Sequence, residues 1–314
     1  MSFQGPGSAQ LGVLYEHPQW FQPLFAALGR RGLPYVPLQL GGHGFDPSSL
    51  EVPAPLILSR VAQSSFLRDP EHPIFYAAAL LDHWQRCGAT VLNGGPTLAI
   101  DSSKARQLSL IASLGLAVPK TRVVHRAIDL PGASEGMDFP LLVKANIGGS
   151  GAGIVRYSSL DELHSSVANG TCPQSVDKVL LIQDYVPARG GTILRIETLR
   201  GRFLYGLEVE SGGDTFDLCP ADACVAQPGR SIVRMKAVTP AIEIIRAAER
   251  IAQAAHLFVG GVEVIIDERD GVPRFYDINA MSNFVAEPLS ILGWDPHDRL
   301  IDILEDMLKG RAAA

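Results

Sequence analysis

Strands and helices alternate along the first hundred residues, and no other feature of the sequence constrains the fold as strongly. The expected strands span residues 11–16, 55–61 and 89–94, and the expected amphipathic helices span residues 19–32 and 73–88. This alternation predicts parallel βαβ units, because parallel neighbours need a crossover helix between them. Residues 1–100 are therefore expected to form a doubly wound βα domain of the α/β class.

In a sheet of this kind, ligands bind beyond the carboxyl ends of the strands. Ser59 and Arg60 come near the end of one expected strand, and Asn93 comes near the end of the next. We therefore expect these three side chains to face a cleft, and Arg60 is a candidate substrate-binding residue.

The pattern changes after residue 100. An aspartate or serine in Asp101–Ser103 is expected to cap a helix over residues 103–114, and from there to Asp184 the chain reads as strand, strand, helix, strand. The remaining strands and helices are expected at 192–199, 202–210, 239–256, 261–279 (a hairpin) and 296–309. We expect an α+β part made of two subdomains, residues 101–186 and residues 187–314.

Composition narrows the classes of function. The formal net charge is −6, so a dedicated nucleic-acid-binding protein is not expected, because such proteins carry a basic surface. No apolar run approaches the roughly 20 residues that span a bilayer, and no export signal is visible at the start. Four cysteines in 314 residues do not indicate a disulfide scaffold. We expect a cytoplasmic enzyme with small-molecule substrates and no membrane partner, and a homodimer is compatible with this.

A lysine precedes a glycine-rich stretch in LLVKANIGGSGAGIVRYSS, residues 141–159. A phosphate-binding P-loop has its lysine after the glycines, and a dinucleotide-binding fingerprint opens a helix, so neither motif fits. A hairpin with a glycine-rich turn is one interpretation, since glycine favours tight turns. Four glycines exceed the need of a turn, and bare N–H groups beside a fixed ammonium suit an oligophosphate. The stretch alone leaves both interpretations open.

The hairpin at 261–279 carries a second group of polar residues. Alternation places Phe275, Asp277 and Asn279 on one face of its second strand, and antiparallel pairing can bring Glu263 of the first strand beside them. Two carboxylates and an amide oxygen are hard donors that suit Mg²⁺. A solvated polar face is the alternative, but it does not account for acidic groups inside the apolar run FYDIN.

The order of these motifs resembles the ATP-grasp superfamily. The motifs are, in order along the chain, Lys104 ahead of a helix, Lys144 before the glycine-rich loop, the segment IQDYV at 182–186, and a glutamate followed at a distance by D-x-N. The chain is most similar to the RimK-type glutamate ligases, and more distantly to D-alanine–D-alanine ligase, over about residues 93–283. The resemblance implies an ATP-grasp fold, with two subdomains that clamp ATP and the N-terminal βα domain beside them.

The resemblance also implies roles for individual residues. Lys104 and Lys144 match the lysines that hold the ATP phosphates, and Gly148–Gly153 matches the mobile loop that closes over them. Arg195 matches the arginine that neutralises the transferred phosphoryl group. The other implied positions are Gly149, Ser150 and Gly151 in the loop, Gln183, Asp184, Tyr185 and Val186 along the adenine edge, and Glu263, Asp277 and Asn279 as ligands of two Mg²⁺ ions.

Other positions bear on the ribose and the substrates. Ile193 stands where the RimK pattern has a ribose-binding aspartate, so the ribose must be recognised elsewhere or weakly. The segment DLCPADAC falls where RimK-like enzymes shape the acceptor site, so Cys219 and Asp222 are candidate substrate residues. Ser282 and Asn283, just beyond the hairpin, are further candidates. The single C-x₄-C pair in DLCPADAC is a weak indication of zinc, and we expect structural or substrate-binding cysteines there.

The resemblance implies an ATP-dependent carboxylate–amine ligase that acts on an amino acid or small peptide. Forming an acyl phosphate from ATP and a carboxylate needs in-line positioning and neutralisation of charge, which two lysines, an arginine and Mg²⁺ supply. A phosphotransferase on the same fold and a non-catalytic ATP-binding regulator are the alternatives. The complete set of lysine and metal positions argues against the regulator, whereas the sequence does not separate the ligase from the kinase.

Overall fold

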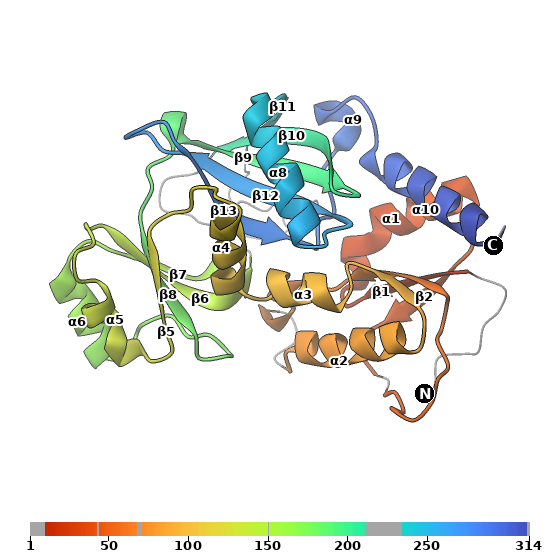
Figure 1. The fold of residues 1–314 in the computed structure, drawn as a ribbon, viewed down its shortest axis with the longest axis horizontal. Coiled ribbons are helices and arrows are strands. Elements are labelled where there is room, and N and C mark those ends of the chain that lie inside the picture. The colour runs from red at the N-terminus through yellow and green to blue at the C-terminus, as the bar shows by residue number, and fades with distance from the viewer. Residues whose placement is uncertain (1–9, 43, 68–70, 150, 211–233, 313–314) are drawn as a thin grey trace.

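The computed structural model of the chain describes residues 10–42, 44–67, 71–149, 151–210 and 234–312. These residues form three β-sheets with helices packed on them, so the mixed α/β class is confirmed (Figure 1). Within these residues, no helix combines the length and the apolar character needed to cross a membrane.

The first sheet is parallel, with strand order β2-β1-β3-β4. Its strands are β1 Leu11–Tyr15, β2 Tyr35–Gln39, β3 Leu56–Arg60 and β4 Thr90–Leu92, and its helices are α1 Gln22–Arg31 and α2 Pro73–Arg86. Every residue of β3 is buried, because helices cover both faces of the sheet. Leu56 and Leu58 pack in one cluster with α1, whereas Ile57 packs with α2. The doubly wound arrangement expected from the alternation is therefore present.

Four further helices of the described residues belong to this part of the chain; the first two lie between elements of the first domain, and the last two lead from β4 to the second sheet. They are η1 Pro18–Phe21, η2 Gln63–Leu67, α3 Gly95–Asp101 and α4 Lys104–Ser113. The hydroxyl of Ser103 accepts a hydrogen bond from the Arg106 amide at 3.3 Å and caps α4. Asp101 is not the cap, because it belongs to α3, a helix that the sequence pattern did not predict.

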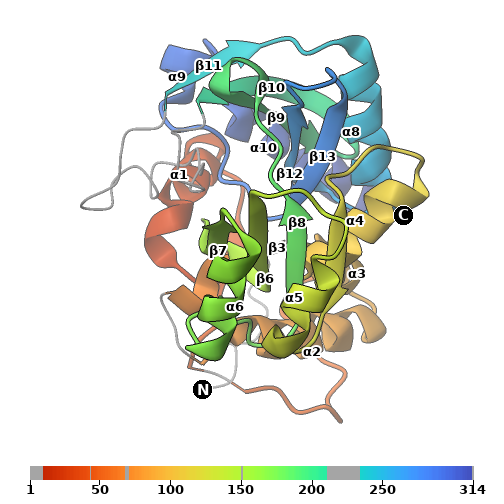
Figure 2. The same cartoon turned by 90° about the vertical axis from the view of Figure 1, so that its left-hand side faces the viewer.

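The second sheet is antiparallel, with strand order β5-β8-β6-β7. Its strands are β5 Thr121–Val124, β6 Leu141–Gly149, β7 Ala152–Tyr157 and β8 Leu180–Asp184, and its helices are η3 Ala127–Asp129, α5 Leu130–Ala133 and α6 Leu160–Ala168. The helices α5 and α6 lie on its outer side (Figure 2). The expected order of strand, strand, helix and strand corresponds to β6, β7, α6 and β8, whereas β5 and α5 were not predicted.

The third sheet has five antiparallel strands in the order β11-β10-β9-β12-β13. The strands are β9 Thr192–Leu199, β10 Arg202–Glu210, β11 Met235–Val238, β12 Val259–Ile266 and β13 Pro273–Asn279. The described residues of this part also form the helices η4 Arg189–Gly191, α8 Ile242–Ala254, α9 Pro288–Ile291 and α10 Pro296–Ala312. One face of the sheet packs against α4 and α8, where Ile111, Ile251 and Val262 share a core. The expected bounds of β9 and β10 agree with the structure.

The C-terminal helix returns to the N-terminal sheet. Leu28 of α1, Leu207 of β10 and Leu304 of α10 belong to one buried cluster, so the first and third sheets share a core. Arg31 of α1 also forms an ion pair with Asp302 of α10 at 2.9 Å. The division of the chain at residues 100 and 186 stays a prediction.

Candidate active site

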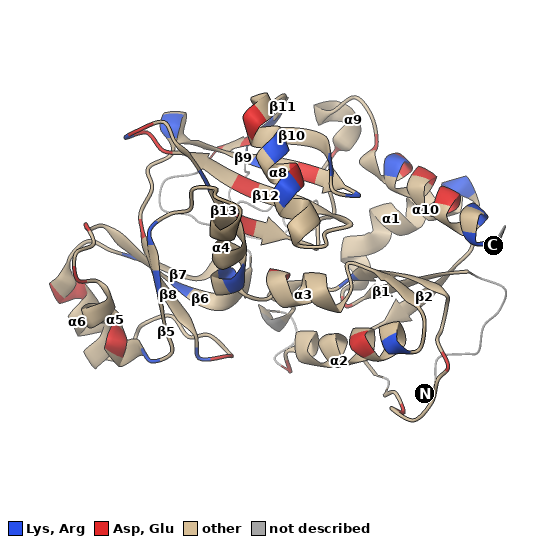
Figure 3. Ribbon diagram, viewed as in Figure 1, with Lys and Arg blue, Asp and Glu red and all other residues tan. Residues whose placement is uncertain are grey.

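A cavity lies between the second and third sheets and reaches the N-terminal domain. Basic positions on α4 and β6 and acidic positions on β12 and β13 lie around it (Figure 3). The predicted nucleotide, catalytic and metal residues that line it are Lys104, Lys144, Gly149, Gly151, Gln183, Asp184, Tyr185, Val186, Arg195, Glu263, Asp277 and Asn279. Ser150, the remaining predicted loop residue, lies outside the described residues. The structure thus brings together positions that are far apart in the sequence.

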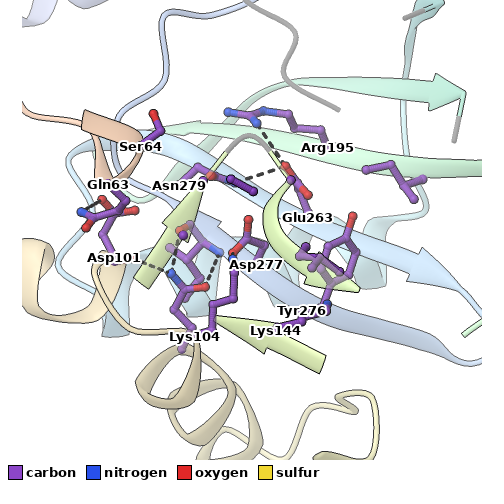
Figure 4. A pocket seen from close by; sticks show the side chains of 18 of the residues that line it. Gln63, Ser64, Asp101, Lys104, Lys144, Arg195, Glu263, Tyr276, Asp277 and Asn279 are labelled. Carbon is purple, nitrogen blue, oxygen red and sulfur yellow. Dashed lines mark hydrogen bonds and ion pairs between the residues drawn. The ribbon is translucent and has the colours of Figure 1, made fainter. Parts of the chain in front are cut away.

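Lys104 is the first residue of α4, so the cap of the helix sets its position. Its Nζ atom forms an ion pair with Oδ1 of Asp277 at 2.9 Å (Figure 4). Burial lowers the pKa of the Lys104 ammonium, but the carboxylates of Asp277, Glu263 and Asp101 together outweigh burial, so the pKa is raised overall. Lys104 is therefore a permanent cation at neutral pH.

Lys144 lies on β6 and is 8% exposed. Its Nζ atom lies 5.6 Å from the centre of the Tyr276 ring. Burial, followed by the like charge of Lys104, lowers the pKa of Lys144 to about 8. The regular pairing of β6 with β7 is interrupted directly after Lys144. The lysine therefore stands on a strand where the glycine-rich segment begins, as the sequence predicted.

Asn146 ties the two lysine segments together, and sequence reasoning missed it. Its Oδ1 atom accepts hydrogen bonds from the Ser103 hydroxyl at 3.0 Å and from the Ala105 amide at 2.9 Å. Its Nδ2 atom donates to Oδ2 of Asp177 at 2.6 Å. These bonds join β6 to the first turn of α4, whose amides need partners. The one signal in the sequence that could have pointed to Asn146 is the presence of a polar residue inside an otherwise apolar strand.

The hairpin pairs Glu263 directly with Asp277. Nδ2 of Asn279 donates to Oε1 of Glu263 at 3.2 Å, so the three predicted metal ligands lie together. A bulge shifts the register next to Glu263, so Phe275 pairs with Val264 and packs in the core. The expectation that Phe275 shares a face with Asp277 is therefore wrong.

The donor set of the hairpin fits a divalent cation. Burial, followed by the charge of Asp277, raises the pKa of the Glu263 carboxyl. Two carboxylates and an amide are hard oxygen donors, and a bound cation would relieve the repulsion between the carboxylates. Among the described residues, this site included, no group of three or more His, Cys, Asp or Glu side chains is arranged so that it could hold a metal ion. The fit therefore rests on Glu263, Asp277 and the amide of Asn279.

Arg195 lies in the middle of β9, beside β12, and is 5% exposed. Its guanidinium forms ion pairs with Oε1 of Glu197 at 2.6 Å and with Oε1 of Glu263 at 3.1 Å. Burial lowers the pKa of Arg195, but these two carboxylates outweigh burial and raise it overall. Gly261 leaves room for the pair, since a Cβ atom there would lie 2.8 Å from Oε1 of Glu197.

The segment Gln183–Val186 lies at the end of β8 and lines the cavity. Nε2 of Gln183 donates to Oγ1 of Thr121 at 2.8 Å, so this side chain is held by β5. The amides of Asp184 and Tyr185 donate to backbone carbonyls at 2.9 and 3.3 Å. Two backbone amides of the segment expected along the adenine edge are therefore already hydrogen-bonded within the protein.

The predicted substrate residues do not share one location. Ser282 and Asn283 line the cavity next to the hairpin. Arg60 is buried behind Asn283, and its Nη2 atom donates to Oδ1 of Asn283 at 3.5 Å. Cys219 and Asp222 lie outside the described residues.

Asn93 does not line the cavity, contrary to the expectation that it faces a cleft. Its Nδ2 atom donates to the carbonyl oxygens of Val259 and Ala280, both at 2.7 Å. Its Oδ1 atom accepts hydrogen bonds from the amides of Phe258 at 2.7 Å and Val259 at 3.3 Å. The side chain thus joins the first sheet to the third. Ser59 and Arg60 are likewise buried and do not line the cavity, so they do not face the expected cleft either.

Asp101 and Gln63 link the N-terminal domain to the hairpin, and no sequence signal pointed to this role. The Asp101 carboxylate accepts hydrogen bonds from Nε2 of Gln63 at 2.5 Å and from the Ala280 amide at 3.0 Å. Burial raises the pKa of Asp101 to about 6. Ala280 directly follows Asn279, so Asp101 fixes the end of β13.

No family model matches the chain. The chain is 23% identical over 192 residues to a probable alpha-L-glutamate ligase from Pseudomonas putida strain GB-1, covering 61% of this chain and 60% of that protein. It is 26% identical over 122 residues to a probable alpha-L-glutamate ligase from Pseudomonas fluorescens, covering 38% of this chain and 40% of that protein. The matches therefore span less than two thirds of the length of these curated relatives.

Solved structures match almost the whole chain. A RimK-domain ATP-grasp protein from Sphaerobacter thermophilus has a TM-score of 0.69 at 17% identity, covering 94% of this chain and 98% of that one. D-alanine–D-alanine ligase from Bacillus anthracis, complexed with ATP, has a TM-score of 0.67 at 14% identity, covering 98% and 99%. The ATP-grasp ligase PsnB, complexed with minimal precursor, Mg and ADP, has a TM-score of 0.65 at 15% identity, covering 97% and 99%. The chain has the ATP-grasp fold.

Proposed function

We propose that this ATP-grasp chain is an ADP-forming ligase that joins a carboxylate to an amine through an acyl phosphate. One observation carries the proposal: two lysines, an arginine and two carboxylates line a single cavity. Lys104 and Lys144 approach from α4 and β6, while Arg195, Glu263 and Asp277 approach from the third sheet. Phosphoryl transfer needs cationic groups around the moving phosphoryl group and little covalent chemistry from the protein.

The two lysines would bind the nucleotide phosphates. Lys144 has no carboxylate partner among the described ion pairs, so a phosphate oxygen would supply its counter-charge. Lys104 would be shared between phosphate and Asp277, its partner in the structure. The glycine-rich loop Gly148–Gly153 would close over the phosphates with its backbone N–H groups.

Glu263, Asp277 and Asn279 would hold magnesium, and a two-ion centre is part of the proposal. When bound, magnesium supplies charge neutralisation for the phosphates. Arg195 is fixed by Glu263 and Glu197 and borders the cavity, so its guanidinium would stabilise the phosphoryl group during transfer. A planar guanidinium can donate two parallel N–H hydrogen bonds to a phosphoryl group, which an ammonium cannot do.

The remaining lining residues would bind the adenine and the substrates. The segment Gln183–Val186 would face the adenine, and Ser282 and Asn283 would face the substrates. The similarity to proteins named glutamate ligases favours an amino acid or small peptide as substrate. We also propose that the enzyme works in the cytoplasm.

A kinase on the same fold is the competing function, because it would use the same lysines, arginine and metal ligands. The similar proteins named as ligases favour ligation over phosphorylation of one substrate. A purely regulatory ATP-binding protein would have no need of Arg195, which two buried carboxylates hold at the cavity.

An ADP-release screen tests the proposal. The full chain is incubated with ATP, Mg²⁺ and amino acids, singly and in pairs, and the products are identified by mass spectrometry. We expect ADP and phosphate in equal amounts only when a carboxylate and an amine are both present, with a product equal in mass to both substrates less one water. A stable phosphorylated product from one substrate would identify a kinase instead, and no ADP with any pair would contradict the proposal.

A further inference from the structure

The strand that carries two of the three proposed metal ligands lies at the edge of its sheet. β13 pairs with β12 on one side and is last in the order of the described strands of the third sheet. Helix α4 lies along its other side (Figure 1). Ile278 of β13 is 1% exposed, so water cannot pair with the backbone groups that it turns away from β12. Another segment of the chain must therefore supply their partners.

Gln107 of α4 supplies both partners of Ile278. Its Oε1 atom accepts a hydrogen bond from the Ile278 amide at 3.0 Å, and its Nε2 atom donates to the Ile278 carbonyl oxygen at 3.0 Å. Nε2 also donates to the carbonyl oxygen of Asp101 at 2.9 Å. The side chain of Gln107 therefore pairs with Ile278 as a residue of a neighbouring antiparallel strand would, because it exchanges both hydrogen bonds with it.

Ile278 stands between Asp277 and Asn279 in the chain. Its side chain packs in the core that contains Ile111 of α4. Because side chains alternate along a strand, those of Asp277 and Asn279 lie on the opposite face, where Glu263 pairs with Asp277 and accepts a hydrogen bond from Asn279. A rotation of the backbone at Ile278 would therefore displace two of the three proposed metal ligands at once.

Gln107 differs from the other residues that hold this end of β13. Lys104, one turn earlier on α4, forms an ion pair with the Asp277 carboxylate, and the Asp101 carboxylate accepts a hydrogen bond from the Ala280 amide at 3.0 Å. Both of these contacts involve a charged side chain, which a metal ion or a phosphate could attract. Gln107 is neutral and bonds through its side chain to backbone groups, so its contacts with β13 do not compete with a bound ion for charge.

We propose that Gln107 is a positioning residue that holds Asp277 and Asn279 in the orientation in which they bind a divalent cation. This inference rests on the proposed function, because it concerns the magnesium site of that reaction. Replacing a residue that orients metal ligands without touching the metal typically costs about 10–100-fold in metal affinity or activity. The loss of the Gln107 amide should therefore weaken metal binding much more than it weakens binding of the nucleotide alone.

Nucleotide binding with and without metal tests this inference in the absence of turnover. AMP-PNP is titrated calorimetrically into the full chain, once with EDTA and once with saturating Mg²⁺, and the ratio of the two affinities gives the magnesium enhancement. We expect an enhancement of at least ~10-fold for the wild-type chain, because the metal joins the phosphates to the carboxylates. Gln107→Met keeps a similar shape without the hydrogen bonds and should lose most of the enhancement, while its affinity in EDTA should change by less than about twofold.

Two further variants control for folding. Thr97 of α3 is 2% exposed, and its hydroxyl donates to the carbonyl oxygen of His256 at 2.7 Å. Thr97→Val thus removes a buried hydrogen bond to the backbone without touching β13, and it should keep the wild-type enhancement even where urea denaturation shows a loss of stability. Gln107→Asn keeps the amide but is one methylene shorter, so it cannot reach Ile278 in the same way and should also lose the enhancement. It carries the test if Gln107→Met does not fold.

Three results would overturn the inference. They are a wild-type enhancement in a folded Gln107 variant, an equal loss of enhancement in Thr97→Val, and failure of both Gln107 variants to fold, which would show a role in folding alone. Failure of the proposed function gives different results. A wild-type chain whose AMP-PNP binding gains nothing from Mg²⁺ would reject the metal site and this inference with it. A phosphorylated product in the ADP-release screen would reject the ligase but leave the role of Gln107 standing, because a kinase needs the same metal site.

Discussion

At the scale of single residues, the three cations of the cavity differ in how they are neutralised. Lys104 is paired with Asp277, and Arg195 is paired with two glutamates. Lys144 lacks such a partner among the described ion pairs, and burial together with Lys104 lowers its pKa to about 8. A phosphate group would therefore change the protonation of Lys144 more than that of the other two cations.

Lys144 gives a prediction about proton uptake. At pH 8.5, above its pKa of about 8, the unliganded lysine is mostly neutral, and a bound phosphate restores its proton. We expect AMP-PNP binding at pH 8.5 to take up more than about half a proton through Lys144, and its affinity to fall as the pH rises further. Calorimetry in two buffers of different ionisation enthalpy measures this uptake. Lys144→Met should lose it while the exposed Lys120→Met keeps it, and equal uptake in Lys144→Met would contradict the assignment.

Arg195 gives a prediction about rate. Arg195→Lys keeps the positive charge, but a lysine cannot donate two parallel N–H hydrogen bonds to a phosphoryl group. We expect kcat to fall by the equivalent of about 2–4 kcal/mol, with a much smaller change in ATP affinity. Steady-state kinetics and ATP titration check this, with the exposed Arg202→Lys as the control. An unchanged kcat would show that Arg195 only pairs with its buried glutamates.

The sequence could place the main polar residues because each carries a motif or an alternation signal. Lys104, Lys144 and Glu263 were predicted, and they line one cavity in the structure. Asn146 and Asp101 were missed as site residues, because side chains that bond to the backbone of distant segments follow no sequence period. Their positions depend on which segments meet in the tertiary fold.

At the scale of elements, long periodic segments were predictable and short edge segments were not. The bounds expected for β9 and β10 agree with the structure. The strand β5 has only four residues, all at least partly exposed, so it lacks the apolar run that marks a strand. The bulge beside Glu263 was also unpredictable, because one inserted residue changes which side chains share a face without changing the composition.

Close packing of β12 against β13 gives a prediction about stability. A Cβ atom on Gly260 would lie 2.3 Å from the carbonyl oxygen of Asn279, a distance that backbone atoms cannot tolerate. Gly260→Ala should destabilise the fold by about 1–3 kcal/mol through overpacking. Gly29→Ala in α1 meets nothing within 4 Å and should be neutral or stabilising. Urea denaturation compares the two, and a Gly260→Ala variant as stable as Gly29→Ala would refute the packing argument.

At the scale of the whole molecule, the active-site cavity depends on contacts between distant parts of the chain. The alternation of strands and helices predicted the first sheet, and the resemblance predicted the ATP-grasp fold. Neither predicted that α10 packs on α1 or that Asn93 bonds to the third sheet, because such long-range contacts leave no local signal. Asn93 therefore has a structural role where the sequence predicted a place in the cleft.

Asn93 gives a prediction about the coupling of the first and third sheets. Its amide group makes four hydrogen bonds to the backbone of Phe258 and Val259 at the start of β12 and of Ala280 just after β13. Asn93→Ala leaves buried amides and carbonyls unpaired, so we expect a loss of about 2–4 kcal/mol in the free energy of unfolding. Asn169→Ala, at an exposed helix end, should change it by less than about 0.5 kcal/mol. Equal effects of the two changes would argue against this coupling.

Transfer of oxygen from the substrate to phosphate tests the proposed ligase chemistry most directly. The full chain is given ATP, Mg²⁺ and a mixture of amino acids labelled with ¹⁸O in their carboxyl groups, and the released inorganic phosphate is analysed by mass spectrometry. An acyl-phosphate intermediate keeps one carboxyl oxygen on the phosphorus when the amine displaces phosphate, so we predict one ¹⁸O atom in each phosphate released by ligation. Release of ADP with unlabelled phosphate, or with phosphate retained on a stable product, would contradict the ligase.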